Sequence, residues 1–277
     1  EDSLTDLARS ISAHTAVTRD DGDARATCID ALTLMRTDRP TPIDPTCYEP
    51  VICLILQGSK EIEFGSQRVR AGRGESIVVS HDLPIRSRIV EASVARPYLV
   101  AVVRLDLGTL RSLAEDFEDA PPGNHDHVAL KVATASPEVV DTVRRLVALT
   151  DTPADAQILA PLALKELHYR LLQADHSAML RRLLRRDSHA SRIAKAIARI
   201  RNDLTQPLSV PELARVATMS ASTFHQHFKD VTTTTPLQYQ KSLRLLEARR
   251  LIRDEDRSVS EAAFEVGYQS STQFSRE

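Results

Sequence analysis

Two stretches of the chain repeat one pattern, Ser209-Val-Pro-Glu-Leu-Ala-Arg-Val-Ala-Thr-Met219 and Ser258-Val-Ser-Glu-Ala-Ala-Phe-Glu-Val-Gly-Tyr268. They align without a gap at an offset of 49 residues. In each, a serine precedes a short helical pattern and a glutamate follows three residues later, which is the signature of a capped helix start. A small alanine, Ala214 or Ala263, lies where a second helix could cross closely, and a Ser/Thr-rich helical pattern follows the turn. The repeat therefore predicts two helix-turn-helix units.

The second helix of the first unit has an apolar face and a polar face. Phe224 and Phe228 are four residues apart, so they should pack together under the first helix. The remaining positions are small at the N-terminal end and rich in donors and acceptors, as a DNA-reading helix requires. Glutamine suits adenine, so Gln226 is a candidate base-reading residue, whereas Lys229 is a candidate phosphate contact. The outward positions are Ser222, His225, Gln226 and Lys229.

In the second unit, Tyr268 and Phe274 take the packing role. Arg276 could form bidentate hydrogen bonds with guanine. One polar helix face usually indicates only contact with solvent, but two such faces in register favour DNA binding. The outward positions here are Ser271, Thr272, Gln273, Ser275 and Arg276.

Between the units, Thr235-Pro236 reads as a helix cap followed by proline at the first helical position. A helical pattern then continues to about Asp254, which corresponds to a helix of roughly 27 to 30 Å at about 1.5 Å per residue. Major-groove segments on one face of DNA recur about every 34 Å. One rigid helix could therefore hold both recognition helices in successive grooves.

The first two thirds of the chain read differently. Short apolar runs separated by Gly and Pro predict a small antiparallel barrel or sandwich. After the polar, Pro-rich loop 116–126, helical patterns with apolar periodicity return. The expected strands are Val51–Leu56, Glu61–Phe64, Ser76–Val79, Ile85–Val90 and Tyr98–Leu105.

We place a domain boundary near Asp187, which divides the chain into an N-terminal domain, 1–187, and a DNA-binding domain, 188–277. The barrel should cover about 28–106 and the helices about 137–187. The expected fold class is thus α+β: an N-terminal antiparallel β-barrel with following helices, then an all-α domain with two helix-turn-helix units joined by a long helix. The net charge is −2 overall, but the segment from His189 onward holds 13 basic and 10 acidic residues, which is compatible with phosphate contact.

The composition argues against a membrane-spanning protein and against a disulfide-stabilised secreted protein. The 277 residues are 42% hydrophobic, enough for two cores, and no run approaches the about 18 to 20 apolar residues of a membrane span. We expect a cytoplasmic protein. Cys28, Cys47 and Cys53 form an odd set without paired spacing, which fits a reducing compartment. Burial as small hydrophobic side chains explains them better than a role in thiol sensing.

Two histidine features are weighed as sites. His125-Asp-His127 has the spacing of a metal-binding pair, but it lies in a Pro-Gly-Asn loop without a third ligand. His81-Asp82 lies at a strand end before Pro84, where it could meet an effector, and a turn explains it equally well. No nucleophile elbow, phosphate-binding glycine loop or catalytic carboxylate pair is visible. We therefore expect no catalysis, no metal and no cofactor.

These motifs together resemble the AraC/XylS transcription regulators. The resemblance covers both domains and implies that 1–187 is a sensor and dimerisation domain, in which a cupin-like barrel binds a small effector or a partner protein. It also implies promoter DNA and RNA polymerase as partners. The helices around Val139 to Leu172 are then expected to form a homodimer. It rests on Pro207–Ala214, Met219-Ser, Phe228-Lys229, Pro236–Tyr239, Leu243–Leu251, Ala262–Phe274, Tyr48-Glu-Pro, Leu54–Lys60 and Asp82–Pro84. The DNA-binding positions that it implies are Ser222, Thr223, His225, Gln226, Lys229, Ser271, Thr272, Gln273, Ser275 and Arg276.

The chain departs from the family in two respects. The family usually has glycine where this chain has Thr218 and Thr233, and because positive φ would strain threonine, we expect these turns to differ. The chain begins at Glu1 and stops at Glu277, before the family's second recognition helix ends, so we expect both ends to be trimmed and the second unit to be incomplete.

Two alternatives stay open. A metal-dependent cupin-type enzyme fused to a DNA module would carry stoichiometric iron, zinc or manganese. A helical protein-interaction module would show no salt-dependent association with DNA. The residues that bind the effector, the operator sequence and the direction of regulation are not identified by the sequence, because a sensor pocket is assembled from separated strands.

Overall fold

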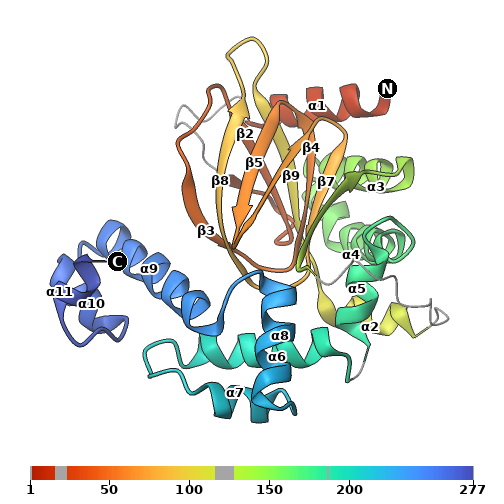
Figure 1. Cartoon of the computed structure of the whole chain (residues 1–277). Helices are drawn as coiled ribbons and strands as arrows, with labels where there is room; N and C mark the ends of the chain where they lie inside the picture. Colours follow the sequence, from red (N-terminus) through yellow and green to blue (C-terminus); the bar gives the residue numbers. More distant parts are fainter. Residues whose placement is uncertain (1, 16–23, 116–127, 186, 277) are drawn as a thin grey trace.

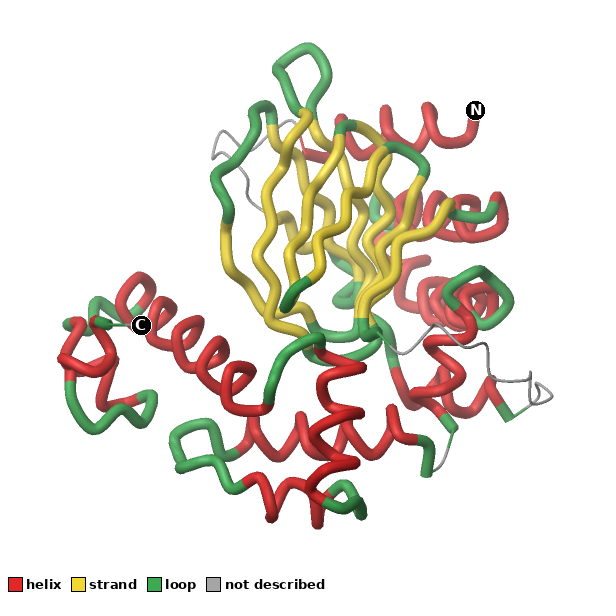
Figure 2. Tube along the Cα trace, viewed as in Figure 1, coloured by secondary structure: helices red, strands yellow, loops and turns green. Residues whose placement is uncertain are grey.

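The structure is a computed structural model that describes residues 2–15, 24–115, 128–185 and 187–276. Two antiparallel sheets face each other, and helices cover the outer face of one of them (Figure 1). The C-terminal helices lie below and beside the open end of this sandwich, as the trace coloured by secondary structure also shows (Figure 2). The expected α+β class with an N-terminal β domain, following helices and a helical C-terminal part is confirmed.

The strands form two open antiparallel sheets. The six-stranded sheet runs in the order β1 (Ala24–Ala26), β2 (Leu32–Thr37), β9 (Tyr98–Arg104), β4 (Val51–Gln57), β7 (Glu75–Val79) and β10 (Leu130–Thr134). The four-stranded sheet runs in the order β3 (Asp44–Tyr48), β8 (Leu83–Glu91), β5 (Ser59–Phe64) and β6 (Gln67–Gly72). Sheet structure extends beyond 28–106, because β1 and β10 add edge strands on either side of that range.

Strand β4 shows why its sequence is a continuous apolar run. Ile52 and Leu54 pack toward the helices, whereas Val51, Cys53 and Ile55 pack toward the second sheet. A strand buried on both faces has no polar alternation. The alternating sequence of β5 instead places one face of the strand inside the sandwich and the other face toward solvent.

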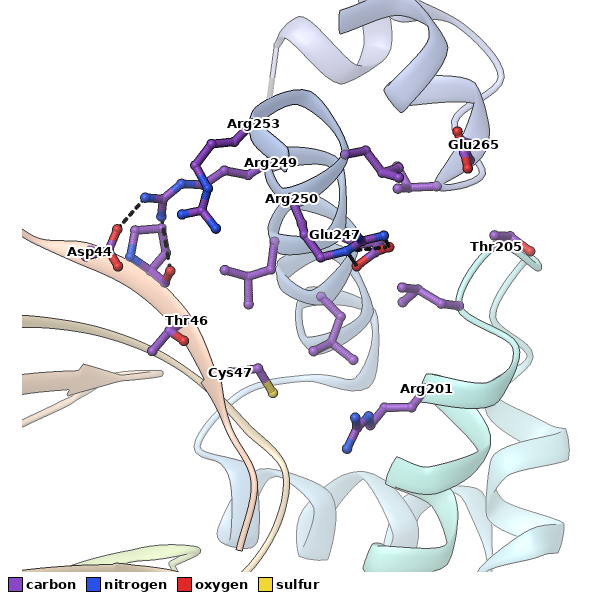
Figure 3. Close-up of a pocket in the computed structure, with 16 residues that line it drawn as sticks. Asp44, Thr46, Cys47, Arg201, Thr205, Glu247, Arg249, Arg250, Arg253 and Glu265 are labelled. Carbon is purple, nitrogen blue, oxygen red and sulfur yellow. Dashed lines mark hydrogen bonds and ion pairs between the residues drawn. The ribbon is translucent and has the colours of Figure 1, made fainter. Parts of the chain in front are cut away.

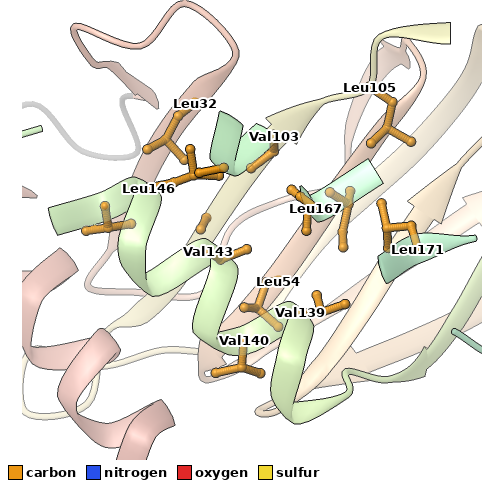
Figure 4. Packing of buried hydrophobic residues seen from close by; sticks show 14 of the residues in the cluster. Leu32, Leu54, Val103, Leu105, Val139, Val140, Val143, Leu146, Leu167 and Leu171 are labelled. Carbon is orange, nitrogen blue, oxygen red and sulfur yellow. The ribbon is translucent and has the colours of Figure 1, made fainter. Parts of the chain in front are cut away.

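Five helices accompany the sheets. Their apolar sides form one cluster with the outer face of the six-stranded sheet, where Val139, Val143 and Leu146 contact strand residues such as Leu54 and Val103 (Figure 4). None of the described helices combines the length and apolar character needed to cross a membrane. The helices are α1 (Asp2–Thr15), α2 (Leu107–Ala114), α3 (Pro137–Leu149), α4 (Pro153–Leu171) and α5 (Ser177–Leu184).

The C-terminal part contains α6 (His189–Asn202), α7 (Val210–Val216), α8 (Ala221–Thr232), α9 (Pro236–Asp254), α10 (Val259–Glu265) and α11 (Ser271–Ser275). Its apolar residues do not form one separate core. Those of α6 to α8 and the start of α9 join the cluster that fills the space between the two sheets. The last turns of α9 form a second, small cluster with α10 and α11. The first unit therefore shares a core with the sandwich, while the second unit has its own.

Candidate nucleic-acid interface and effector cavity

The first unit, α7 and α8, is held by local caps and by tilted and edge-on contacts between aromatic rings. Ser220 accepts a hydrogen bond from the Thr223 amide and so caps the first turn of α8. Phe224 and Phe228 are fully buried with ring centroids 5.5 Å apart, as their spacing predicted. The Phe228 ring in turn meets Tyr239 of α9 edge-on, also at 5.5 Å. These contacts fix α8 against α7 and the start of α9.

The outward face of α8 carries the predicted DNA-binding residues. Its side chains already form local hydrogen bonds: Gln226 Nε2 donates to Asp230 Oδ1 at 2.8 Å, and Ser220 Oγ lies 2.8 Å from Thr223 Oγ1. These bonds limit the rotamers of the face before it meets any partner. The five predicted residues of this unit, Ser222, Thr223, His225, Gln226 and Lys229, are all exposed.

The two threonine turns adopt the conformation that glycine would allow. Thr218 has φ 51° and Thr233 has φ 59°, both in the left-handed region. The expectation that threonine would change these turns was therefore wrong. The Thr233 hydroxyl lies 2.7 Å from the neighbouring Thr232 carbonyl and can also donate to the carbonyl oxygen of Phe64 in the sandwich, at 2.9 Å, which is a compensating contact. The Thr218 hydroxyl is 2.7 Å from the neighbouring Ala217 carbonyl, which is a local contact only.

The second unit, α10 and α11, begins with a complete capping box at Ser258 and Glu261. Its turn needs glycine for two reasons. Gly267 has φ 91°, and a Cβ there would lie 2.3 Å from the carbonyl oxygen of Thr205. Tyr268 and Phe274 pack edge to face with centroids 5.2 Å apart, as predicted from the sequence.

The turn of the second unit is one residue longer than the turn of the first unit. The serines that cap the first helices, Ser209 and Ser258, are 49 residues apart, but those that cap the second helices, Ser220 and Ser270, are 50 apart. Gln269 is the additional residue. Position for position, Gln226 of α8 therefore corresponds to Arg276 at the end of α11. Thr272, Gln273, Ser275 and Arg276 are exposed, and Ser271 is half-buried.

One arginine holds the two units at a fixed spacing. Arg244, in the middle of α9, donates to the carbonyl oxygens of Leu204 at 2.8 Å and Gln206 at 2.9 Å, both before α7. The same guanidinium donates to Gly267 O at 3.3 Å and lies over the Tyr268 ring. Arg244 thus joins the loop that leads into α7 to the turn of the second unit, while α8 and α11 lie at opposite ends of α9 (Figure 1).

Hydrogen bonds also attach the first unit to the sandwich. The Ala129 amide donates to Val231 O at 2.9 Å, and the Tyr239 hydroxyl donates to Asp82 O at 2.6 Å. A cleft of about 620 Å³ lies beside this junction, between β3 and α9 (Figure 3). Across it, Arg249 of α9 pairs with Asp44 of β3 at 2.5 Å. Both side chains are largely exposed, so water screens this pair strongly.

His81 has a structural role at the same junction. Its Nε2 donates to the carbonyl oxygen of Ala190 at the start of α6, at 3.1 Å, and its Nδ1 lies 2.8 Å from Ser80 Oγ. Burial lowers the pKa of His81 below its usual value of 6.5. His125 and His127 lie outside the described residues. Within the described ranges, no group of three or more His, Cys, Asp or Glu side chains is arranged to hold a metal ion.

A cavity of about 760 Å³ lies between the two sheets. Strands β2, β4 and β9 of one sheet and β3, β5 and β8 of the other contribute its walls. Its inner lining includes Met35, Tyr48, Cys53, Lys60, Tyr98 and Val100. None of these was predicted from the sequence to be a site residue, because they come from separated strands. The alternation of polar and apolar residues in β5 could have identified Lys60 as an inward-facing residue, because it places Lys60 on the same face as Ile62 and Phe64.

Two family models match the chain and together reach most of its length. Residues 28–179 match the AraC-type transcriptional regulator N-terminus, and residues 213–277 match a helix-turn-helix domain. The chain belongs to the AraC-type transcriptional regulators. The resemblance to the AraC/XylS family that the motifs indicated is thereby confirmed.

Relatives of this AraC-type regulator include the HTH-type transcriptional activators RhaS of Salmonella paratyphi B and Salmonella typhimurium. Each is 28% identical over 144 residues, an alignment that takes in 50% of the chain and 49% of RhaS. The chain thus aligns with about half the length of these curated relatives.

Solved structures share the fold of this AraC-type regulator. ToxT from Vibrio cholerae strain SCE256, bound to an unsaturated fatty acid, gives a TM-score of 0.56 at 10% identity, covering 94% of the chain and 92% of ToxT. ToxT from Vibrio cholerae O395, bound to (E)-4-(8-methylnaphthalen-1-yl)but-3-enoic acid, gives 0.57 at 11% identity, covering 88% and 92%. At this identity the likeness concerns the fold alone.

Proposed function

We propose that this AraC-type regulator binds promoter DNA in a sequence-specific manner through α8 and α11, and so controls transcription. The observation that carries the proposal is the pair of capped helices with polar outward faces, held at a fixed spacing by Arg244 and α9. A helix α9 of 19 residues spans about 28 Å at about 1.5 Å per residue. This length is close to the separation of successive major grooves on one face of DNA.

In this proposal, residues 1–187 form the sensor and dimerisation domain and residues 188–277 form the DNA-binding domain. The cavity between the sheets holds a small effector. Effector binding then changes the position or freedom of the helices that carry α8 and α11. The relation to activators named RhaS supports RNA polymerase as a further partner.

A second copy of the chain is the proposed partner of α4. Ile158 and Leu162 are 70% and 63% exposed, and with Tyr169 they form one stripe, because they are spaced by four and seven residues along the helix. Replacing Leu162 by Asp should convert the dimer to a monomer in sedimentation velocity. The control is Val94→Asp, since Val94 is 79% exposed and lies outside α4. A dimer that survives Leu162→Asp would contradict this interface.

DNA binding is tested with duplexes selected from a random library and then measured by fluorescence anisotropy across a salt series. Replacing Gln226 or Arg276 by Ala should cost about 1 to 3 kcal/mol at one base position each. Replacing Lys229 by Ala should weaken all sequences alike and reduce the salt slope by about one. Binding without salt dependence or sequence preference would refute the proposal and favour a protein-interaction module. Stoichiometric metal in the purified protein would revive the cupin-type enzyme.

A further inference from the structure

One strand places a lysine inside the sandwich. Ile62 and Phe64 of β5 are fully buried between the sheets, while Glu61 and Glu63 point outward and pair with arginines of the neighbouring strands. Because side chains alternate along a strand, Lys60 belongs to the inward set. It lines the inter-sheet cavity and is half-buried. An ammonium group at such a position requires compensation, because transfer of a charge from water into a protein interior is unfavourable.

The compensation that the described residues supply is neutral. Lys60 Nζ donates to the hydroxyl of Tyr48 at 2.6 Å and lies 5.2 Å from the centre of its ring. Burial raises the pKa of Tyr48 well above its usual range, so the phenol stays uncharged. Burial likewise raises the pKa of the Cys53 thiol to about 11 and that of Cys47 to about 12. These neighbours do not cancel the positive charge at neutral pH.

The carboxylates at the cavity wall are engaged elsewhere. Asp44 pairs with Arg249 of α9, and Glu49 pairs with Arg201 of α6 at 3.3 Å. Among the described residues, no ion pair joins either of them to Lys60. Within the part of the chain that the structure describes, the positive charge of Lys60 on the inner wall therefore has no ion-pair partner.

The rest of the inner wall is mainly apolar. Val51, Val100 and Val102 face the cavity with Met35 and Ile89. At about 760 Å³, the space falls within the range of pockets that hold small organic ligands. Arg88 and Arg201, which also line the cavity, are paired with Glu61 and Asp82. An apolar wall with the Lys60 ammonium group and a phenol beside it selects a ligand with an apolar body and an anionic head.

We propose that the effector of this regulator is a small amphipathic organic anion, an aliphatic or aromatic carboxylate, whose head pairs with Lys60 and Tyr48 inside the sandwich. The inference that this ligand acts as an effector rests on the proposed function. The binding site itself is argued from the cavity alone, so its test needs no DNA. Charge-assisted hydrogen bonds to a buried carboxylate account for the selection of the anion over a neutral molecule of the same shape.

The test uses two dyes of similar aromatic body on the purified full chain: the anion 8-anilinonaphthalene-1-sulfonate and the neutral N-phenyl-1-naphthylamine. Lys60→Met should weaken binding of the anionic dye by about ten- to a hundredfold and leave the neutral dye within about twofold. Lys165→Met, on the exposed side of α4, is the matched control and should change neither. In the wild type, octanoate should displace the anionic dye at a concentration at least about tenfold lower than octanol does.

Unchanged affinity of Lys60→Met for the anionic dye, or equal displacement by octanoate and octanol, would overturn the proposal. If Lys60→Met loses both dyes because the sandwich is disturbed, Lys60→Arg decides. A retained preference for the anionic dye supports a cation-dependent site, and a lost preference refutes it. Failure in these experiments would leave DNA binding unaffected, whereas failure of DNA binding in the anisotropy series would leave the dye result standing.

Discussion

Replacing Thr218 by glycine should stabilise the protein, whereas the same change at Thr233 should not. Both threonines have positive φ, at 51° and 59°, which is unfavourable for a β-branched residue. Such a residue costs about 1 to 3 kcal/mol in the folded state. Glycine removes this strain but adds about 0.5 to 1 kcal/mol of backbone entropy to be lost on folding. For Thr218→Gly, the net gain should be about 1 kcal/mol.

At Thr233 the same gain is offset by a lost contact. The Thr233 hydroxyl donates to the carbonyl oxygen of Phe64, and this bond joins α8 to β5. A hydrogen bond of this kind contributes about 1 kcal/mol net. Among the described residues, the Thr218 hydroxyl has a hydrogen bond only with the adjacent Ala217 carbonyl, and the backbone bonds of that turn persist in the glycine variant. Thr233→Gly should therefore leave the free energy of unfolding nearly unchanged.

The measurement is the thermal midpoint of each variant, where about 1 kcal/mol corresponds to roughly 2 to 4 °C in a chain of this size class. Thr218→Ala is the control, because alanine also lacks the hydroxyl but keeps the penalty for positive φ. It should not gain stability. A midpoint for Thr218→Gly at or below the wild type, or an equal rise in both glycine variants, would refute the reasoning.

Three further outcomes are expected. Gly65→Ala should lower the thermal midpoint, since its Cβ would lie 2.1 Å from Thr233 Oγ1, whereas Gly72→Ala should change it little because the nearest atoms there are 3.8 Å away. Stability should fall as pH drops below about 6.5, because burial depresses the folded-state pKa of His81 and the unfolded chain binds the proton more tightly. The thermal midpoint of His81→Gln should therefore decline less steeply between pH 8 and 5 than that of the wild type. Iodoacetamide at pH 8 should modify Cys28, which is exposed, and spare buried Cys53 in an intact-mass time course; equal rates at both would contradict the burial.

The helix-turn-helix units could be predicted because their signals are local. The capping serines Ser209 and Ser258 act on amides three residues away, and the Phe224–Phe228 spacing defines a face within one helix. The extra residue in the second turn could not be predicted from such local signals. The chain pattern around Tyr268 is the same whether the next helix begins one residue earlier or later.

The cavity and part of the sandwich could not be assigned in this way. Lys60 and Tyr48 meet because β5 and β3 both pair with β8, and that pairing is a long-range property. Helix α1 was missed although Leu7 and Ile11, four residues apart, are both fully buried. Strand β10 (Leu130–Thr134) is too short to show a period of its own and is defined by its pairing with β7.

The core that the first unit shares with the sandwich has a consequence for exchanging modules between regulators. A chimera joined at Asp187 would bring a foreign α8 against the β5–β6 hairpin, where Gly65 leaves room only for the Thr233 turn. A graft that begins after Arg244 instead would keep Tyr239 and Leu243 in the shared core and would transfer the last turns of α9 and the second unit with their own small cluster. If α8 and α11 read DNA as proposed, sequence recognition is more readily re-engineered through α11 than through α8.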